Sequence, residues 1–511
     1  MMHSVINHII AHPPEPGHRI SFTRLDGTES LELRQLYERS GRVASWLRGL
    51  GVGRGDRIGV LAANGIEWVL LDLAALRLGA VTTGFEPGKF DPDGSLLGRY
   101  RLRLLFTDRP ANRLGALLPI SHVRRAADGA ARDEIPAPIT YAPDDVTTLK
   151  LTSGSTGEPK ALATTVGSID SSLNAVQEMF AHGKSDNLFV FLPLSLLQQR
   201  YWIYSALRFG HNVTVSTYEA AFPALARAHP TVVMGVPAFY ETARRHIEAQ
   251  ARKAKSGAVD KALHAAGRRL FGGRIRYLWT GSAPASAEML RFFTGIGLPI
   301  YEGYGLNETC IVSKNHPGAS REGSVGRVLP GKQVLLSADG VISVRCEYPV
   351  NTRYEYAPAG ESERVFGRDG TVRTGDLGYI DEDGFLFIRG RADDVIVLDN
   401  GKKIIVRPME ERMKASPAIE ECVLFCPTQT HLVAVVSPAR QPADTAAIAE
   451  HLARTNAAFG RDEQIRRVVV ARERFSVAND LLTSQFKPRR GRILETYRAE
   501  IHDNQGGIVA C

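Results

Sequence analysis

The sequence has 511 residues, a length that predicts about three domains. Apolar residues make up 44% and charged residues 23%, which is ordinary for a globular protein, and the net charge of +8 is spread without a basic block. A nucleic-acid partner is therefore not expected, whereas an anionic small substrate is compatible with this charge. No apolar run is long enough for a transmembrane segment, and the five scattered cysteines predict no disulfide framework, so we expect the reducing cytoplasm.

The first part of the chain alternates predicted helices and strands. Apolar residues recur at helical spacing over 33–50, and glycines end that helix. A buried strand is predicted at 58–62, an apolar helix at 68–78 and a further strand from Gly79. This alternation predicts a parallel sheet covered by helices. Later strand-like runs with the same rhythm lie at 188–193, 212–216, 231–237 and 275–280.

From about residue 320 the pattern changes to alternating runs separated by Asp-Gly turns between 339 and 384. These hairpin signals predict an antiparallel, β-rich subdomain over about 320–390. Beyond residue 390, short strand-like runs indicate a small mixed domain. We therefore predict an α/β protein with a large N-terminal domain of helix-covered sheets, 1–390, and a small α+β C-terminal domain, 391–511.

Residues 152–160, Thr-Ser-Gly-Ser-Thr-Gly-Glu-Pro-Lys, carry the most specific local signal. Glycines let the backbone bend sharply, and successive N–H groups in such a bend form a concavity that holds anions. The hydroxyl groups add donors and Lys160 adds a mobile positive charge, so the bend is suited to a polyphosphate. The spacing differs from the Walker pattern, and the plain alternative is a flexible surface loop. The candidate phosphate-binding residues are Thr152, Ser153, Gly154, Ser155, Thr156, Gly157 and Lys160.

A second cluster, at 303–309, reads Gly-Tyr-Gly-Leu-Asn-Glu-Thr. Tyr304 stands between two glycines and can offer its ring face to a flat base. Glu308 supplies a hard oxygen ligand that suits Mg²⁺ beside phosphates. Alone, Glu308 is equally consistent with a solvated loop acid, but its combination with the hydroxyl-rich bend favours the ligand interpretation.

Three weaker motifs follow. Asp376, after a Thr-Gly turn, can accept two ribose hydroxyl groups, although an Asx-turn is the simpler alternative. Residues 390–394, Gly-Arg-Ala-Asp-Asp, are also consistent with a polar linker that contains an Arg–Asp pair. The basic run at 486–492 is, by itself, typical of a solvated face.

The order and separations of these motifs resemble the adenylate-forming superfamily of acyl-CoA synthetases, nonribosomal-peptide adenylation domains and luciferases. The resemblance extends from Leu33 to Lys487 and implies a mobile C-terminal domain with the active site between the two domains. It implies that Gly281, Ser282 and Ala283 line the adenine and acyl sites. Residues Glu302, Gly303, Tyr304, Glu308 and Thr309 match the adenine-stacking and magnesium motif, with Thr152 and Glu308 as the expected metal-binding residues.

The resemblance also assigns residues near the domain junction. Asp376 and Arg391 match the residues that bind the ribose, and Asp393 falls on the domain hinge. Lys487 matches the C-terminal lysine that closes on the substrate carboxylate and the α-phosphate. The expected catalytic residues are therefore Lys487, Glu308 and Lys160.

The implied reaction is attack of a carboxylate on the α-phosphate of ATP, which gives an acyl-adenylate and pyrophosphate with Mg²⁺ on the phosphates. Rotation at Asp393 then withdraws Lys487 and admits a second nucleophile. The leading interpretation is CoA as acceptor, with a medium- or long-chain aliphatic or a cyclic acid. An amine or the phosphopantetheine of an external carrier protein is the alternative. A nucleotide-binding regulator without catalysis is disfavoured because Glu308, Asp376, Arg391 and Lys487 are all present.

Two departures from the family pattern stand out. Residues 192–195, Leu-Pro-Leu-Ser, resemble long-chain acyl-CoA synthetases, but Leu196 stands where that motif continues with histidine. Pro488 directly follows Lys487 and fixes the local backbone. No aspartate occurs in 192–200 to hold a substrate amine, which favours an acid without an α-amino group.

Overall fold

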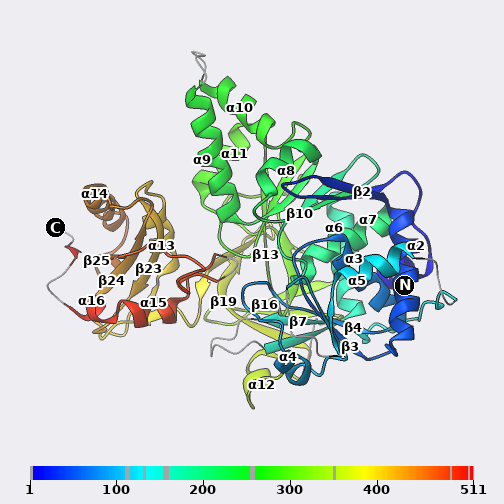
Figure 1. The fold of residues 1–511 in the computed structure, drawn as a ribbon. Helices are drawn as coiled ribbons and strands as arrows, with labels where there is room; N and C mark the ends of the chain where they lie inside the picture. The colour runs from blue at the N-terminus through cyan, green and yellow to red at the C-terminus, as the bar shows by residue number, and fades with distance from the viewer. Residues whose placement is uncertain are drawn as a thin grey trace.

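The computed structural model describes residues 4–109, 115–129, 134–152, 160–253, 259–348, 353–483, 486–503 and 507–509. A large N-terminal part contains two main sheets with helices around them, and a smaller C-terminal part lies to one side (Figure 1). The predicted α/β fold class is confirmed. Within these residues no helix combines the length and apolar character needed to cross a bilayer.

The larger main sheet has nine strands in the order β15-β14-β13-β12-β11-β9-β10-β1-β2. Its central strands, from β13 to β1, are parallel, and the strands at both edges are antiparallel. The predicted strand at 212–216 is confirmed residue for residue. The bounds are β1 Arg19–Thr23, β2 Thr28–Glu32, β9 Asn187–Val190, β10 Asn212–Ser216, β11 Val232–Gly235, β12 Tyr277–Thr280, β13 Ile300–Leu306, β14 Cys310–Lys314 and β15 Arg327–Val328.

The second main sheet has seven strands in the order β18-β8-β7-β4-β3-β5-β6. Strands β7 to β6 are parallel, as the alternating sequence predicts, and β8 and β18 add an antiparallel edge. The bounds are β3 Arg57–Leu61, β4 Val81–Gly84, β5 Leu104–Thr107, β6 Leu117–Pro119, β7 Val146–Thr152, β8 Lys160–Thr165 and β18 Tyr354–Glu355. The predicted phosphate loop therefore falls between the end of β7 and the start of β8.

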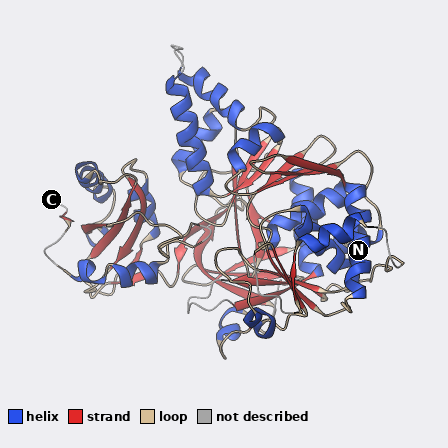
Figure 2. Ribbon diagram, viewed as in Figure 1, coloured by secondary structure: helices blue, strands red, loops and turns tan. Residues whose placement is uncertain are grey.

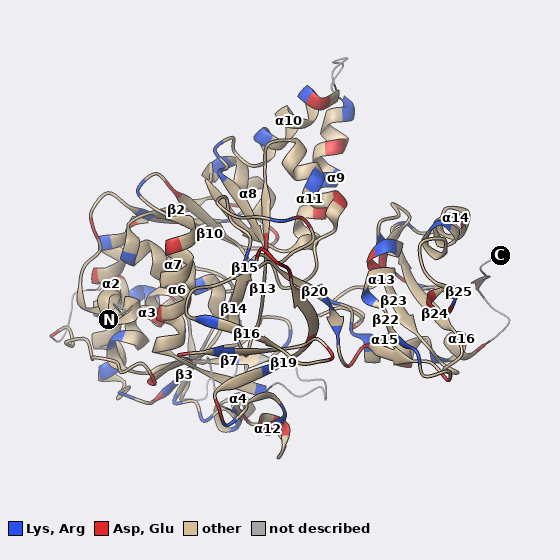
Figure 3. Cartoon of the chain, turned by 180° about the vertical axis from the view of Figure 1, so that it is seen from behind, with Lys and Arg blue, Asp and Glu red and all other residues tan. Residues whose placement is uncertain are grey.

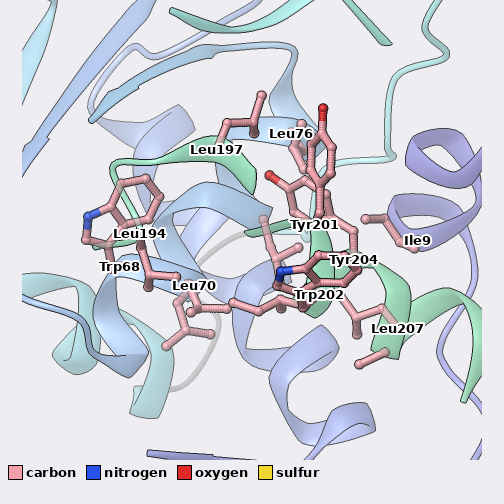
Figure 4. Close-up of a cluster of buried hydrophobic side chains, with 14 of the residues drawn as sticks. Ile9, Trp68, Leu70, Leu76, Leu194, Leu197, Tyr201, Trp202, Tyr204 and Leu207 are labelled. Atoms are coloured by element: carbon pink, nitrogen blue, oxygen red, sulfur yellow. The ribbon is translucent and has the colours of Figure 1, made fainter. Parts of the chain in front are cut away.

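A layer of helices lies between the two sheets and forms the main hydrophobic core. Helix α3 is buried on nearly every face, which matches its almost entirely apolar sequence. Gly79 ends this helix in the left-handed conformation, at φ 76°. Figure 4 shows Trp68, Leu70 and Leu76 of α3 near Tyr201, Trp202 and Tyr204 of α7. The helices of this layer are α1 Val5–Ala11, α2 Leu33–Gly49, α3 Ile66–Leu78, α5 Ser121–Asp128, α6 Val166–Phe180 and α7 Leu197–Phe209.

Other helices cover the outer faces of the two sheets. On the outer face of the nine-stranded sheet they pack around Phe191 and Phe239, and α9 and α10 project away from the body (Figure 2). Helix α4 packs on the outer face of the seven-stranded sheet. The bounds are α4 Gly94–Arg99, α8 Ala221–Ala228, α9 Pro237–Lys253, α10 Val259–Leu270 and α11 Ala287–Gly295. A further short helix, α12 Glu361–Val365, has no buried side chain.

The segment predicted to be β-rich forms a four-stranded sheet in the order β16-β17-β19-β20, and every pair is antiparallel as expected. Its strands are β16 Lys332–Leu336, β17 Val341–Cys346, β19 Thr371–Ile380 and β20 Leu386–Arg391. The boundary predicted at 390 falls at the end of β20. The division into domains stays a prediction.

Beyond β20 the chain forms a small sheet with helices on both faces. The sheet order is β23-β24-β25-β26, and a separate two-stranded ribbon, β21-β22, precedes it. The strands are β21 Val395–Val397, β22 Lys403–Ile405, β23 Ile419–Phe425, β24 Leu432–Pro438, β25 Ile465–Val470 and β26 Ile508–Val509. The helices are α13 Arg407–Lys414, α14 Thr445–Asn456, a 3₁₀ turn Arg461–Glu463, α15 Arg490–Thr496 and α16 Arg498–His502.

Candidate active site

The predicted phosphate loop is bracketed by two paired strands. Thr152 at the end of β7 pairs with Lys160 at the start of β8, so the chain reverses between them. Ser153, Gly154, Ser155, Thr156 and Gly157 lie outside the described residues, as does the side chain of Thr152.

Lys160, at the start of β8, is held by groups from a distant segment. Its ammonium forms an ion pair with Glu361 of α12 and lies 5.1 Å from the ring centroid of Tyr354 on β18. The cation lowers the pKa of the Glu361 carboxyl, through the hydrogen bond first and the charge second. A phosphate that recruits Lys160 therefore has to compete with this carboxylate.

Glu308 shares Tyr354 with Lys160. The Tyr354 hydroxyl donates to Glu308 Oε1 at 2.7 Å, and burial together with this carboxylate raises the pKa of Tyr354. Mg²⁺ in nucleotide sites is usually bound by one or two carboxylates together with substrate phosphates. The second carboxylate oxygen of Glu308 is suited to be such a ligand. In the described part of the chain no group of three or more His, Cys, Asp or Glu could hold a metal ion. A site on Glu308 therefore depends on the phosphates.

Thr309 makes contacts within its own turn, and its contact to a nucleotide stays a prediction. Its buried hydroxyl accepts from the Leu306 amide at 3.0 Å and donates to the Cys310 carbonyl at 3.1 Å. These bonds close the turn between β13 and β14. That turn presents Glu308.

The predicted base and ribose residues are in contact with each other. The Tyr304 hydroxyl donates to Asp376 Oδ2 at 2.5 Å, and Arg391 Nη1 donates to Asp376 Oδ1 at 3.1 Å. Arg391 also donates to the Thr374 carbonyl at 3.0 Å. The Thr374 hydroxyl donates to the Ile342 carbonyl, which fixes the turn before Asp376. Each Asp376 oxygen retains lone-pair capacity for a further donor, so the buried carboxylate can still accept ribose hydroxyls.

Glu302 supports the segment that carries Gly281, Ser282 and Ala283. Its Oε1 accepts from the Ala285 amide at 3.1 Å, and burial raises the pKa of its carboxyl to about 7. Gly281 and Gly303 lie side by side: a Cβ on Gly281 would be 3.3 Å from the Gly303 carbonyl. Glu302 therefore supports the segment that carries Gly281, Ser282 and Ala283, and its contact to a ligand stays a prediction.

A buried lysine that no sequence motif indicated lies beside Gly303. Lys314 donates to the carbonyls of Thr280 and Tyr301 at 3.0 and 2.7 Å, and its ammonium lies 3.9 Å from the Trp279 ring centroid. Burial lowers the pKa of Lys314 well below its usual value, against the opposing charge of Glu302. Only its place in an apolar strand, 310–314, could have indicated burial.

Lys487 of the C-terminal part lies among residues of the N-terminal part. Burial lowers the pKa of its ammonium, while the charges of Asp376 and Glu308 raise it and that of Arg391 lowers it. Thr483 bonds to Lys487 twice: its amide donates to the Lys487 carbonyl at 2.8 Å, and its hydroxyl accepts from the Lys487 amide at 3.1 Å. The structure therefore brings the predicted C-terminal lysine together with the predicted ribose and magnesium residues.

The predicted hinge lies in an exposed turn between β20 and β21, and Figure 3 shows this connection to the C-terminal part. Asp393 is exposed and lies 3.8 Å from Arg391 Nη2. The next residue, Asp394, pairs with Arg490 at 3.3 Å, and Arg490 also pairs with Glu410 of α13 at 2.7 Å. Arg490 therefore fixes the segment after Lys487 to the residue beside the hinge.

The motif at 192–200 leads into the first turn of α7. Leu196 is the N-cap residue of α7, and the buried Arg200 pairs with Asp72 of α3 at 2.5 Å. Residues 236–240, at the start of α9, lie among aromatic rings, with Phe239 at 4.4 Å from Phe191 between ring centroids.

Comparison with known proteins agrees with this geometry. The sequence pattern of AMP-binding enzymes matches residues 12–340, and that of the AMP-binding enzyme C-terminal domain matches residues 393–504. The long-chain-fatty-acid–CoA ligase FadD15 of Mycobacterium bovis is 31% identical over 449 residues, 76% of this chain and 74% of its own. The 2-succinylbenzoate–CoA ligase of Bacillus cereus is 26% identical over 423 residues, 77% of this chain and 80% of its own.

Solved structures show the same fold. ATP-bound MatB from Rhodopseudomonas palustris superposes with a TM-score of 0.80 at 22% identity, over 98% of this chain and 100% of that one. At this identity the likeness concerns the fold alone. The chain belongs to the AMP-binding enzyme family of the adenylate-forming superfamily, as an AMP-forming ligase of the acyl-CoA synthetase type.

Proposed function

We propose that this protein is an acyl-CoA ligase that activates an aliphatic carboxylic acid with ATP. In the first half-reaction a carboxylate oxygen attacks the α-phosphorus, and the bond to the β-phosphate oxygen breaks. The products are an acyl-adenylate and pyrophosphate. In the second half-reaction the CoA thiol attacks the acyl carbon, loses its proton and releases AMP.

The observation that carries this proposal is the position of Lys487. A cation from the C-terminal part lies within electrostatic reach of Asp376, Arg391 and Glu308. Such a cation can stabilise negative charge that develops between the attacking carboxylate and the α-phosphate. Reactions at phosphorus depend mainly on holding reactants in line and neutralising charge, which is what this set of side chains offers.

Other residues have supporting roles in the proposal. Asp376 and Arg391 bind the ribose, Tyr304 packs against the adenine, and Thr152 to Lys160 bind the phosphates. Glu308, with Thr152, holds Mg²⁺, which when bound neutralises phosphate charge. The wall formed by Gly281, Ser282 and Ala283 borders the adenine and acyl groups.

The proposed substrate is a medium- or long-chain aliphatic or a cyclic acid, and the proposed acceptor is CoA. Support for the acid comes from the aromatic surroundings of Phe239 and from the fatty-acid–CoA ligases among the relatives. Buried Arg200 is engaged by Asp72, and no aspartate occurs in 192–200 to bind an amino group. Support for CoA comes from the same relatives, which are CoA ligases.

The test is exchange of labelled pyrophosphate into ATP over a panel of acids, followed by product mass with CoA, with amines and with a carrier protein. We expect exchange with aliphatic acids and a thioester of CoA. Replacing Lys487 with Ala should slow exchange about 10²- to 10³-fold. No exchange with any acid contradicts the proposal, and a product formed only with an amine or a carrier protein contradicts CoA as the acceptor.

A further inference from the structure

An aromatic contact joins the two parts of the chain beside Lys487. The rings of Tyr218 and Phe486 lie 5.3 Å apart between centroids, inclined by 33°. Tyr218 follows β10 in the N-terminal part, and Phe486 immediately precedes Lys487. Aromatic pairs at this separation are attractive beyond the area they bury.

The backbone at Phe486 is adapted to this contact. Phe486 has φ 58°, a left-handed conformation that a bulky residue seldom adopts and that costs energy. The Phe486 amide donates to the Thr483 carbonyl at 2.8 Å, and the Lys487 amide donates to the Thr483 hydroxyl at 3.1 Å. The loop therefore holds two adjacent side chains in different contacts, Phe486 on Tyr218 and Lys487 near Asp376.

Tyr218 is part of a continuous aromatic cluster. Its ring lies 5.9 Å from Phe191, which lies 4.4 Å from Phe239, and Phe239 lies 4.7 Å from Phe222. Phe191 and Phe239 are buried, so Tyr218 packs against side chains of the hydrophobic core. The surface that Phe486 contacts therefore belongs to the N-terminal part, in the aromatic cluster that contains the buried Phe239.

We propose that the Tyr218–Phe486 ring contact positions Lys487 for acyl-adenylate formation. This inference rests on the proposed function and assigns both rings a role that the motifs do not give them. Neither ring touches the reacting atoms. The contact exists only while the C-terminal part has this orientation, so its loss slows the first half-reaction and spares the second.

The experiment separates the two half-reactions. Phe486→Ala and Tyr218→Ala are assayed for acid-dependent pyrophosphate exchange and, separately, for conversion of a prepared acyl-adenylate and CoA into thioester and AMP. We expect each variant to lose about tenfold in exchange, and the double variant to lose no more than either one, because the same contact is removed. Thioester formation should stay within about twofold of the parent. Phe486→Tyr, which keeps a ring, should recover most of the exchange rate.

Two further variants remove ambiguity. Phe486→Gly removes the ring but suits the positive φ, so an equal loss shows that the ring matters and the backbone does not. Phe222→Ala removes a ring of the same cluster that has no contact with Phe486, and its effect should multiply with that of Phe486→Ala. Three results would each overturn the inference. The first is equal slowing of both half-reactions, and the second is independent effects of Tyr218→Ala and Phe486→Ala. The third is a pyrophosphate exchange rate within twofold of the parent in these variants. If the parent enzyme exchanges no pyrophosphate with any acid, the proposed function fails instead.

Discussion

Asp376→Asn is the substitution that tests the nucleotide site most directly. In the structure both carboxylate oxygens accept bonds, from Tyr304 at 2.5 Å and Arg391 at 3.1 Å, and the side chain is buried. An asparagine retains one acceptor and loses the charge, so one charge-assisted bond to a ribose hydroxyl is lost. Such bonds contribute about 1.5–3 kcal/mol, which corresponds to about a 10- to 150-fold rise in KM for ATP.

The same substitution changes the pH dependence of the first half-reaction. Burial lowers the pKa of Lys487, and the charge of Asp376 is the largest influence that opposes this effect. Without that charge the pKa of Lys487 falls further. Because the protonated amine is the active form, activity is present below this pKa and is lost as the pH rises through it. The alkaline limb of the pH profile should therefore move to lower pH.

The assay is pyrophosphate exchange at a saturating acid concentration, with ATP and pH varied. Asp383→Asn is the matched control, because Asp383 lies on an exposed turn after the same strand and pairs with Arg321. An alkaline limb that stays in place or moves to higher pH in Asp376→Asn refutes the assignment of Lys487. An unchanged KM for ATP refutes the ribose assignment.

Three further predictions concern other contacts. Glu361→Gln removes the ion pair of Lys160, so KM for ATP should fall by about two- to fivefold in exchange assays. Arg200→Met leaves Asp72 buried without its ion-pair partner, which should lower the free energy of unfolding by about 3–5 kcal/mol in denaturant titrations. Gly305→Ala places a Cβ 1.9 Å from the Cys310 carbonyl oxygen, so the loop that presents Glu308 should distort and exchange should fall below detection.

Matched controls accompany these variants. Glu363→Gln lies on the same short helix as Glu361, is exposed and should leave KM for ATP unchanged. Arg200→Met combined with Asp72→Leu should regain much of the lost stability, because no unpaired charge remains. Gly295→Ala, with nothing within 4 Å of the added Cβ, should remain active. The opposite result for any control contradicts the contact on which that prediction is based.

Local sequence patterns predicted those helices and strands whose own residues show a helical or alternating apolar pattern. The helix predicted at 33–50 occurs as Leu33–Gly49, and the antiparallel segment after 320 forms four antiparallel strands. The pairing of the N-terminal hairpin could not be predicted, because β1 joins β10 across a long stretch of chain. Pairing between distant strands depends on tertiary packing, which no local pattern records.

The residues of the candidate site that belong to sequence motifs could be predicted, and those outside the motifs could not. Tyr304, Asp376, Arg391 and Lys487 lie together as the resemblance implied. Tyr354 and Glu361 could not be predicted, because they come from connecting segments without a motif and act through contacts to Glu308 and Lys160. Arg200 lies within a recognised motif, but its partner Asp72 is 128 residues earlier in the chain.

The bonds of Arg490 have a consequence for any movement of the segment around Lys487. Arg490 holds Asp394, beside the hinge, and Glu410 of α13, while Lys487 lies three residues before it. Through Arg490, the segment after Lys487 is therefore tied both to the residue beside the predicted hinge and to α13. A change in the backbone torsion angles at residue 393 would carry this whole assembly with it, whereas a movement of the Lys487 loop alone would have to break these ion pairs.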